Sequence, residues 1–148
     1  MSSPFPFIKQ AEIDDDPVYR APDDAIESWK DLAEQVRAEL TRMGFAASVV
    51  PNGDPFDLPP GAHVWVHSIH PFGVTLDWVA PVTNSPAYRQ KALVQDTSGL
   101  FSYVTKANGI ALQAIHATLL VAGFDAQIDD AEDSVRYFRV LAAPAHPM

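Results

Sequence analysis

Residues 108–124 read NGIALQAIHATLLVAGF, and none of these side chains carries a formal charge. Asn108 can accept hydrogen bonds from the N–H groups of a first helical turn, and Gly123 can adopt the left-handed conformation just past a helix end. Apolar side chains would surround nearly the whole helix, and such a helix is buried on more than one side. The stretch is too short, and too rich in Ala and Gly, for a good membrane span. We therefore expect a central core helix whose second face meets either more of the core or a partner or sister subunit.

The composition limits the classes of function. The 148 residues fit one domain with a proper core. With 19 acidic against 10 basic residues, the net charge of -9 argues against binding to nucleic acid or to anionic membranes, which require clustered Lys and Arg. The sequence has no Cys, which excludes disulfides, thiolate zinc sites and a cysteine nucleophile. The N-terminal residues lack the pattern of a signal peptide, so we expect a cytoplasmic protein. We also expect neither a cofactor nor a metal ion.

Three segments are expected along the chain. Residues 1–22 contain four prolines and a run of three Asp, a pattern that predicts a flexible N-terminal arm without regular structure. Residues 23–143 are expected to form a single domain, and residues 144–148 a C-terminal tail.

The spacing of apolar residues predicts the helices of this domain. An amphipathic helix is predicted over residues 24–43, and a short one over 87–94. Residues 96–109 are ambiguous between helix and strand, and we favour helix. Gly99 and Gly109 are expected to break that segment.

Five short stretches have the pattern of strands. Their order relative to the helices, α-β-β-β-α-β-β, indicates an α+β fold in which helices pack on one face of an antiparallel sheet. The pieces LTRMGF and LLVAGF precede strands in both halves, which leaves open an internal αββ duplication or convergence on a common corner. The expected strands are 46–50, 62–70, 73–80, 125–129 and 134–142.

The two central strands are predicted to form a hairpin. A three-residue turn at 71–73 would pair His67 with Asp77 and Val66 with Trp78, although a shift in register would change these partners. The alternation of side chains then separates a core face from a second face. The core face comprises Val64, Val66, Val74, Leu76 and Trp78, and the second face His63, Trp65, His67 and Asp77.

The histidines of this hairpin are the residues most like an active or metal site. Histidine can transfer a proton near neutral pH or bind zinc, and Asp77 could orient either ring. His63 and His67 lie about 13 Å apart on a straight strand, too far to share one metal ion. A general-base role for His67 is the other functional interpretation. We favour the structural interpretation, a half-exposed sheet face with polar and aromatic side chains.

No other motif indicates catalysis. His116 lies among apolar residues of the central helix, where a histidine is usually a hydrogen-bonded core residue or an interface residue. Residues 125–134 are acidic but lack the Gly and closing Glu of a calcium loop. The sequence has no phosphate loop, dinucleotide fingerprint, nucleophile elbow or HExxH motif.

Two classes of function remain. The first is a small acidic protein-binding domain that holds a protein partner or forms a homodimer. Its element order resembles that of type III secretion chaperones and related small adaptors, and of some toxin-immunity proteins, but no motif carries this likeness and the third helix of the chaperones is missing. The second is a ligand-binding or enzymatic domain for a small molecule, with a pocket between the long loop 51–61 and the second face. The candidate binding surface comprises His63, Trp65, His67, Asp77, Phe56 and His116.

Overall fold

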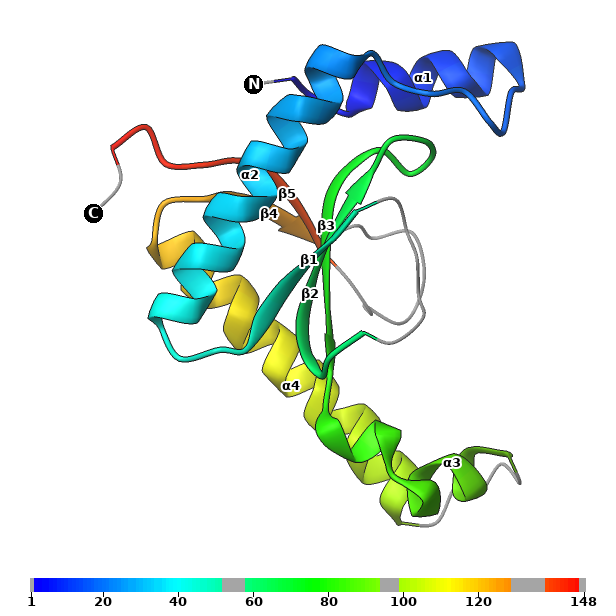
Figure 1. The fold of residues 1–148 in the computed structure, drawn as a ribbon, viewed down its shortest axis with the longest axis vertical. Coiled ribbons are helices and arrows are strands. Elements are labelled where there is room, and N and C mark those ends of the chain that lie inside the picture. The colour runs from blue at the N-terminus through cyan, green and yellow to red at the C-terminus, as the bar shows by residue number, and fades with distance from the viewer. Residues whose placement is uncertain (1, 52–57, 94–98, 129–137, 147–148) are drawn as a thin grey trace.

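A computed structural model describes residues 2–51, 58–93, 99–128 and 138–146. Within these ranges, helices pack against one five-stranded sheet, which confirms the predicted α+β class (Figure 1). The helices are α1 (Phe5–Asp14), α2 (Asp23–Arg42), α3 (Pro86–Leu93), α4 (Leu100–Val121) and the 3-10 helix η1 (Pro81–Asn84). The strands are β1 (Ala47–Pro51), β2 (Gly61–His67), β3 (Gly73–Val79), β4 (Asp125–Ile128) and β5 (Phe138–Ala142).

The sheet is mixed and not wholly antiparallel. Its strand order is β1-β2-β3-β5-β4, which places β1 and β4 at the edges. Three of the neighbouring pairs are antiparallel as expected, but β1 and β2 run parallel. A parallel pair needs a crossover connection, which the local pattern of residues in each strand does not reveal.

Helices α2 and α4 lie on the same side of the sheet (Figure 1). Helix α2 packs over β1, β2 and β3, and α4 packs over β3 and β4. The predicted helix 24–43 is confirmed to within one residue, because most of its apolar side chains recur at helical spacing and are buried on one side of the helix. The buried side chains of α2 are Ala25, Ile26, Trp29, Leu32, Ala33, Val36 and Leu40.

The core lies between these helices and the predicted core face of the hairpin. Val64, Val66, Val74 and Leu76 are all buried against the helices. Trp78 is partly buried and packs against the edge of the same cluster. The core side chains contributed by α4 are Leu112, Ile115 and Leu119.

The hairpin register differs from the prediction by four residues. His63 pairs with Asp77, and His67 pairs with Gly73, because the chain turns over residues 68–72 and not over three residues. A shift by an even number of residues leaves every side chain on its face. The predicted faces are therefore confirmed, whereas the predicted pairing of His67 with Asp77 is wrong.

The N-terminal segment contains a helix, contrary to the prediction of an irregular arm. Pro4 is the N-cap of α1 and Pro6 lies in its first turn, where proline is tolerated because the N–H groups of that turn need no intrahelical partner. The ring of Phe7 packs edge-on against Trp29, with the ring centroids 5.7 Å apart. The indole N–H of Trp29 donates to the carbonyl of Ser2 at 2.8 Å. These contacts attach the N-terminal segment to α2.

Helix α4 is longer than predicted at its N-terminal end. It begins at Leu100, after Gly99 with φ +113°, so the predicted cap Asn108 and the predicted break Gly109 both lie inside it. An interior glycine lowers helix stability by only about 1 kcal/mol, which the surrounding helix tolerates. The predicted end is confirmed, since Gly123 has φ +98°.

The two Gly-Phe corners share one backbone arrangement. Gly44 and Gly123 both have positive φ, and each following phenylalanine N–H donates to the carbonyl five residues earlier, at 2.9 Å for Phe45 and 3.0 Å for Phe124. The strands after them differ, because β1 pairs in parallel with β2 whereas β4 pairs antiparallel with β5. The common corner therefore does not extend to a common strand pairing.

Among the helices that the structure describes, none has the length and apolar character needed to cross a bilayer.

The packing of α2 yields a stability prediction. Leu40 is 0% exposed under the sheet, whereas Met43 at the helix end is 57% exposed. We expect Leu40→Ala to lower the free energy of unfolding by about 2–5 kcal/mol through lost burial and a cavity. Met43→Ala should lower it by less than about 1 kcal/mol. Urea denaturation followed by circular dichroism measures both, and equal losses would contradict this core assignment.

Candidate functional site

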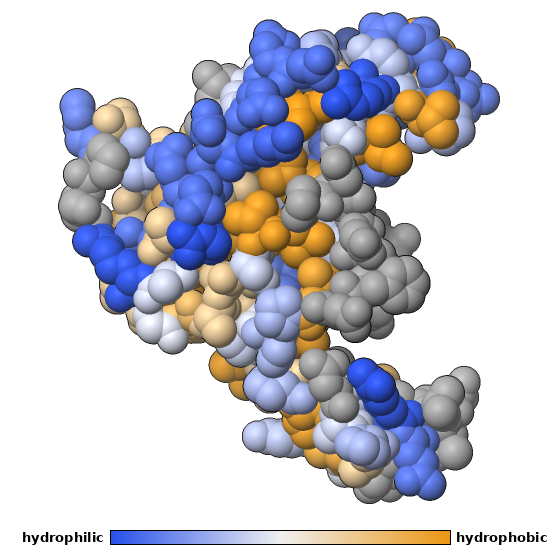
Figure 2. Space-filling model, viewed as in Figure 1, coloured by the Kyte–Doolittle hydropathy of each residue, from blue (hydrophilic) through white to orange (hydrophobic). Residues whose placement is uncertain are grey.

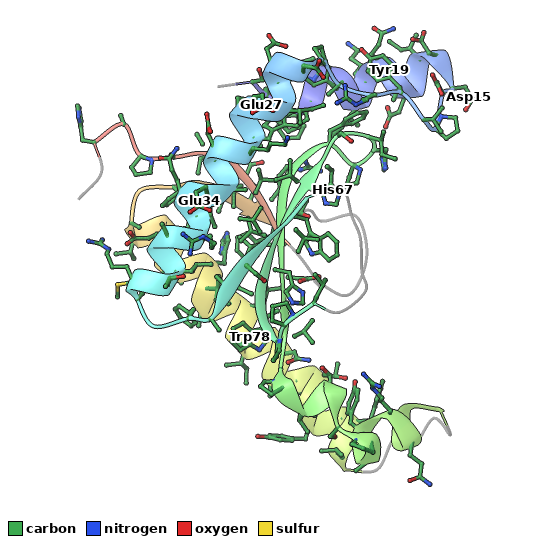
Figure 3. The ribbon with its side chains drawn as sticks, viewed as in Figure 1. Asp15, Tyr19, Glu27, Glu34, His67 and Trp78 are labelled. Carbon is green, nitrogen blue, oxygen red and sulfur yellow. The ribbon has the colours of Figure 1, made fainter. Side chains whose placement is uncertain are left out.

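The second face of the sheet carries most of the residues that the sequence singled out. His63, Trp65 and His67 project from β2, and Asp77 projects from β3, on the side away from α2. Figure 3 shows His67 on that side of the sheet. The alternation along the strands thus brings these four side chains together, although their role as a binding surface stays a prediction.

His63 is more enclosed than a half-exposed face would be, with 3% of its surface accessible. Its Nε2 lies 2.6 Å from the carbonyl oxygen of Pro59, and because a carbonyl only accepts, Nε2 carries a proton and donates it. Its Nδ1 lies 3.2 Å from Oδ1 of Asp77, directly across the hairpin. Both ring nitrogens therefore face protein atoms and neither is directed toward a ligand.

Asp77 is a carboxyl group in a partly apolar environment. Burial raises its pKa, while the electrostatic effect of His63 and a hydrogen bond from Trp65 act in the opposite direction. The contact between Oδ1 and His63 is electrostatic, because it lacks the alignment of a hydrogen bond. The pair fixes the orientation of the His63 ring at the centre of the hairpin.

Trp65 separates the two histidines of β2. Its ring centroid lies 6.2 Å from each imidazole, edge-on to His63 and stacked on His67 with planes 12° apart. An indole between the rings prevents them from binding the same ion. Within the described ranges, no three His, Cys, Asp or Glu side chains are grouped to hold a metal ion.

His67 is held in its neutral form. Its Nε2 lies 2.8 Å from Oγ1 of Thr75 on the neighbouring strand. Burial, together with the positive charges of Arg139 and His70, lowers its pKa to about 4. A general base is most effective when its pKa lies near the operating pH, so this environment does not favour that role for His67.

Arg139 is a member of this face that the sequence did not single out. It pairs with Thr75 in the sheet, is 2% exposed, and donates through its guanidinium to the carbonyl of Phe72 and, at 3.1 Å, to that of Pro71. It thereby ties the last strand to the hairpin turn. The sequence did contain a signal for Arg139, which is a charged residue inside the apolar run Phe138–Leu141. A charge buried in such a run has to be hydrogen-bonded.

The other two predicted surface residues lie elsewhere. Phe56 falls outside the described residues. His116 projects from α4 on the helix side of the sheet, where its Nε2 lies 2.9 Å from the carbonyl of Ala126 and its ring packs edge-on against Phe138 at 5.0 Å. It is therefore a hydrogen-bonded residue of the helix–sheet contact, and not a neighbour of the second face.

Helix α4 has an apolar surface on the side opposite its buried residues. Tyr103 and Ile110 are each 68% exposed and Val121 is 82% exposed. Three alanines, two exposed and one partly buried, lie between them along the same side of the helix. We call this row the α4 stripe; it comprises Tyr103, Ala107, Ile110, Ala114, Ala117 and Val121.

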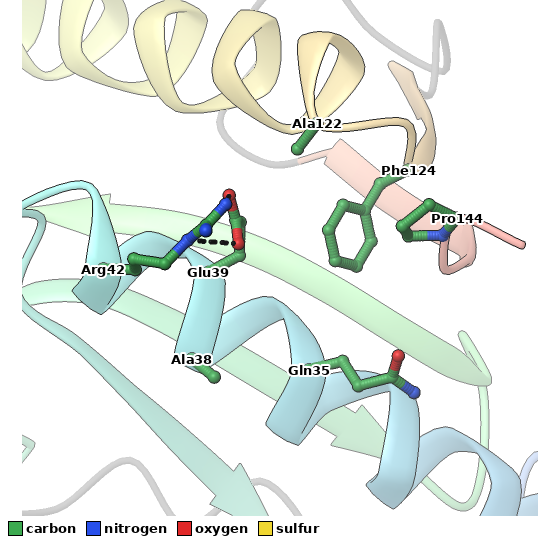
Figure 4. A pocket seen from close by; sticks show the side chains of 7 residues that line it. All are labelled: Gln35, Ala38, Glu39, Arg42, Ala122, Phe124 and Pro144. Carbon is green, nitrogen blue, oxygen red and sulfur yellow. Dashed lines mark hydrogen bonds and ion pairs between the residues drawn. The ribbon is translucent and has the colours of Figure 1, made fainter. Parts of the chain in front are cut away.

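A shallow groove of about 350 Å³ lies between α2 and the residues that follow α4 and β5 (Figure 4). One wall carries the ion pair between Glu39 and Arg42, whose Oε1 and Nη2 atoms are 2.8 Å apart. The groove is on the helix side of the sheet, opposite the face that carries His63 and His67. Its lining residues are Gln35, Ala38, Glu39, Arg42, Ala122, Phe124 and Pro144.

Comparison with known proteins finds no relative, since no family model, no curated protein and no solved structure matches the chain. The geometry of these surfaces therefore carries the functional argument.

The lowered pKa of His67 predicts an acid-sensitive contribution to stability. The unfolded histidine has a pKa of about 6.5, so the unfolded chain binds more protons than the folded chain between that value and about 4. The contribution is complete above the unfolded pKa and is lost as the pH falls through the folded pKa. An NMR titration should show the His67 ring signals changing near pH 4, and a midpoint near 6.5 would contradict this environment.

A pair of variants tests the same point by denaturation. His67→Gln retains a group that can bond to Thr75 but cannot titrate, so its free energy of unfolding should decline less than that of the native chain as the pH falls from 6.5 to 4. His146→Gln, in the exposed tail, should follow the native chain. The idea fails if both variants behave alike.

Arg139 yields a second stability prediction for this face. Arg139→Lys keeps the charge but loses the planar fork that reaches two carbonyls. We expect the free energy of unfolding to fall by about 1–3 kcal/mol, because one buried carbonyl loses its donor. Arg89→Lys on the exposed surface of α3 is the matched control and should change it by less than about 0.5 kcal/mol.

Proposed function

We propose that this chain is a non-catalytic protein-binding domain of the adaptor, chaperone-like or immunity-like kind, and that the α4 stripe is its contact surface. The observation that supports this most directly is the exposure of large apolar side chains on the side of α4 that faces away from the core. Tyr103, Ile110 and Val121 are all more than two thirds exposed on one helix. A contiguous apolar surface of this kind is typical of an interaction site.

The contrast with α2 strengthens the argument. The outward side of α2 is charged and carries ion pairs between residues three apart, as a helix facing water normally does (Figure 2). Helix α4 has a single charged side chain, Lys106, in its 22 residues. Two helices of the same domain thus present opposite surfaces, and only that of α4 suits a second apolar surface.

A protein fits this surface better than a lipid bilayer does. Helices that lie on membranes carry several Lys and Arg residues on their polar side, which anionic headgroups attract. Helix α4 offers only Lys106, and the chain as a whole has a net charge of -9. The partner is therefore expected to be another protein.

The second sheet face supports this proposal indirectly, because its polar side chains are engaged with one another and not directed toward a ligand. Its polar groups contact one another, as the contacts of His63 with Asp77 and of His67 with Thr75 illustrate. A ligand-binding or enzymatic role for this face stays a prediction.

Site-specific photo-crosslinking in the native host tests the proposal. A photoreactive phenylalanine analogue at Ile110 should give discrete crosslinked protein bands, because the side chain would be enclosed by the partner. The same analogue at Asp31, exposed on α2, is the matched control and should give few or none.

The bands are identified by mass spectrometry. Crosslinking at Ile110 that does not exceed that at Asp31 would refute a protein contact on the α4 stripe.

A further inference from the structure

We infer that the occupant of the α4 stripe is the same stripe of a second copy of this chain, with the two helices antiparallel. This inference rests on the proposed function, because it names the partner of the surface proposed there. The spacing of the stripe, the sizes of its side chains and the distribution of charge support it.

The spacing of the stripe is that of a helix–helix seam. Its six residues follow one another at intervals of 4, 3, 4, 3 and 4, from Tyr103 to Val121. This is the heptad spacing at which one helix keeps the same side toward another helix. The row is about 27 Å long, at about 1.5 Å per residue. It runs along nearly the whole of α4, so the contact would be continuous.

The side-chain sizes favour antiparallel pairing. A two-fold axis perpendicular to α4 at the level of Leu112 brings Ile110 opposite Ala114 of the partner subunit. It also brings Ala107 opposite Ala117 of the partner subunit, and Tyr103 opposite Val121 of the partner subunit. In such an isologous contact every pairing occurs twice, so one large residue fills the space above a small one on both sides of the axis. Parallel pairing would set alanine against alanine in three layers and leave the space between them unfilled.

The charge distribution also favours two antiparallel copies. Parallel helices would place the two Lys106 ammonium groups close together. Antiparallel helices place each Lys106 level with Thr118 of the partner subunit, in the last turn of that helix, where the helix dipole favours a positive charge.

The acidity of the chain does not prevent this contact. No Asp or Glu occurs between Asp96 and Asp125, although the chain carries a net charge of -9. The acidic residues therefore lie outside the α4 sequence. Repulsion between charges farther apart than about 8 Å is largely screened at physiological ionic strength.

Light scattering coupled to size-exclusion chromatography tests the inference on the full chain. The native protein at tens of micromolar should have about twice the 16.2 kDa mass of one chain. Ala114→Glu places a charge in the centre of the stripe, on a side chain that is exposed in the single chain, so it should halve the mass without changing the circular dichroism spectrum. Ala117→Glu is a second variant with the same expectation.

The matched control is Thr105→Glu, which adds the same charge to the same helix on an exposed residue outside the stripe. This variant should keep the mass of the dimer. A monomeric native protein, or an Ala114→Glu variant that stays dimeric, would overturn the inference.

Engineered cysteines test the direction of pairing, since the native chain has no Cys. Oxidation of an equal mixture of Ile110→Cys and Ala114→Cys chains should give the mixed disulfide. Tyr103→Cys alone should give none, because the two residues lie at opposite ends of the seam. A rapid disulfide through Tyr103→Cys would establish parallel pairing and refute the antiparallel arrangement.

The two proposals can fail separately. A monomer that crosslinks a different protein through Ile110 would refute the second copy and leave the protein-binding function standing. A monomer with no crosslink at Ile110 would refute both.

Discussion

The contact between the hairpin of β2 and β3 and the helices above it determines the rest of the structure. Both strands lie inside the sheet, and the strand period of two sends Val64, Val66 and Leu76 toward α2 and α4. The same period sends His63 and Trp65 to the opposite side. The composition of the second face is therefore a consequence of core packing. Its polar groups must find partners within the sheet or in the adjoining loops, because buried polar groups are generally hydrogen-bonded.

The sequence predicted the faces of this hairpin correctly but not its pairing. Alternation is local and can be read directly, whereas the register depends on the turn, which spans residues 68–72 and includes Phe72 with a positive φ of 62°. The parallel pairing of β1 with β2 escaped prediction for a related reason, since it depends on where a distant segment returns. The burial of His63 and the role of Arg139 depend on the carbonyls of Pro59 and of the turn, and no spacing in the sequence indicates those contacts.

The errors in predicting the helices arose at proline and glycine, which can either end a helix or be accommodated within it. Proline disrupts the interior of a helix but is well tolerated in the first turn, and the prolines at the start of α1 lie there. Glycine ends a helix when its φ is positive, as at Gly123, whereas Gly109 adopts helical geometry inside α4. Tertiary contacts decide whether the helix ends at such a residue or continues through it, because helical stability in proteins comes mainly from packing. Of the two long helices, the one that was predicted with correct bounds, α2, is the one whose apolar side is unambiguous.

Helix α4 has apolar residues on two sides, and the folded chain covers one of them. Its composition predicted burial on more than one side, and the single chain covers only the side that carries Leu112 and Leu119. The other side gains nothing from folding alone, whereas each square ångström of apolar surface that a partner covers contributes about 25 cal/mol. Because only the folded chain presents Ile110 and Val121 on one side, a partner bound through the proposed contact would stabilise the fold by mass action. The stability of the protein would then increase with the concentration of that partner, which links the exposed surface to the core beneath it.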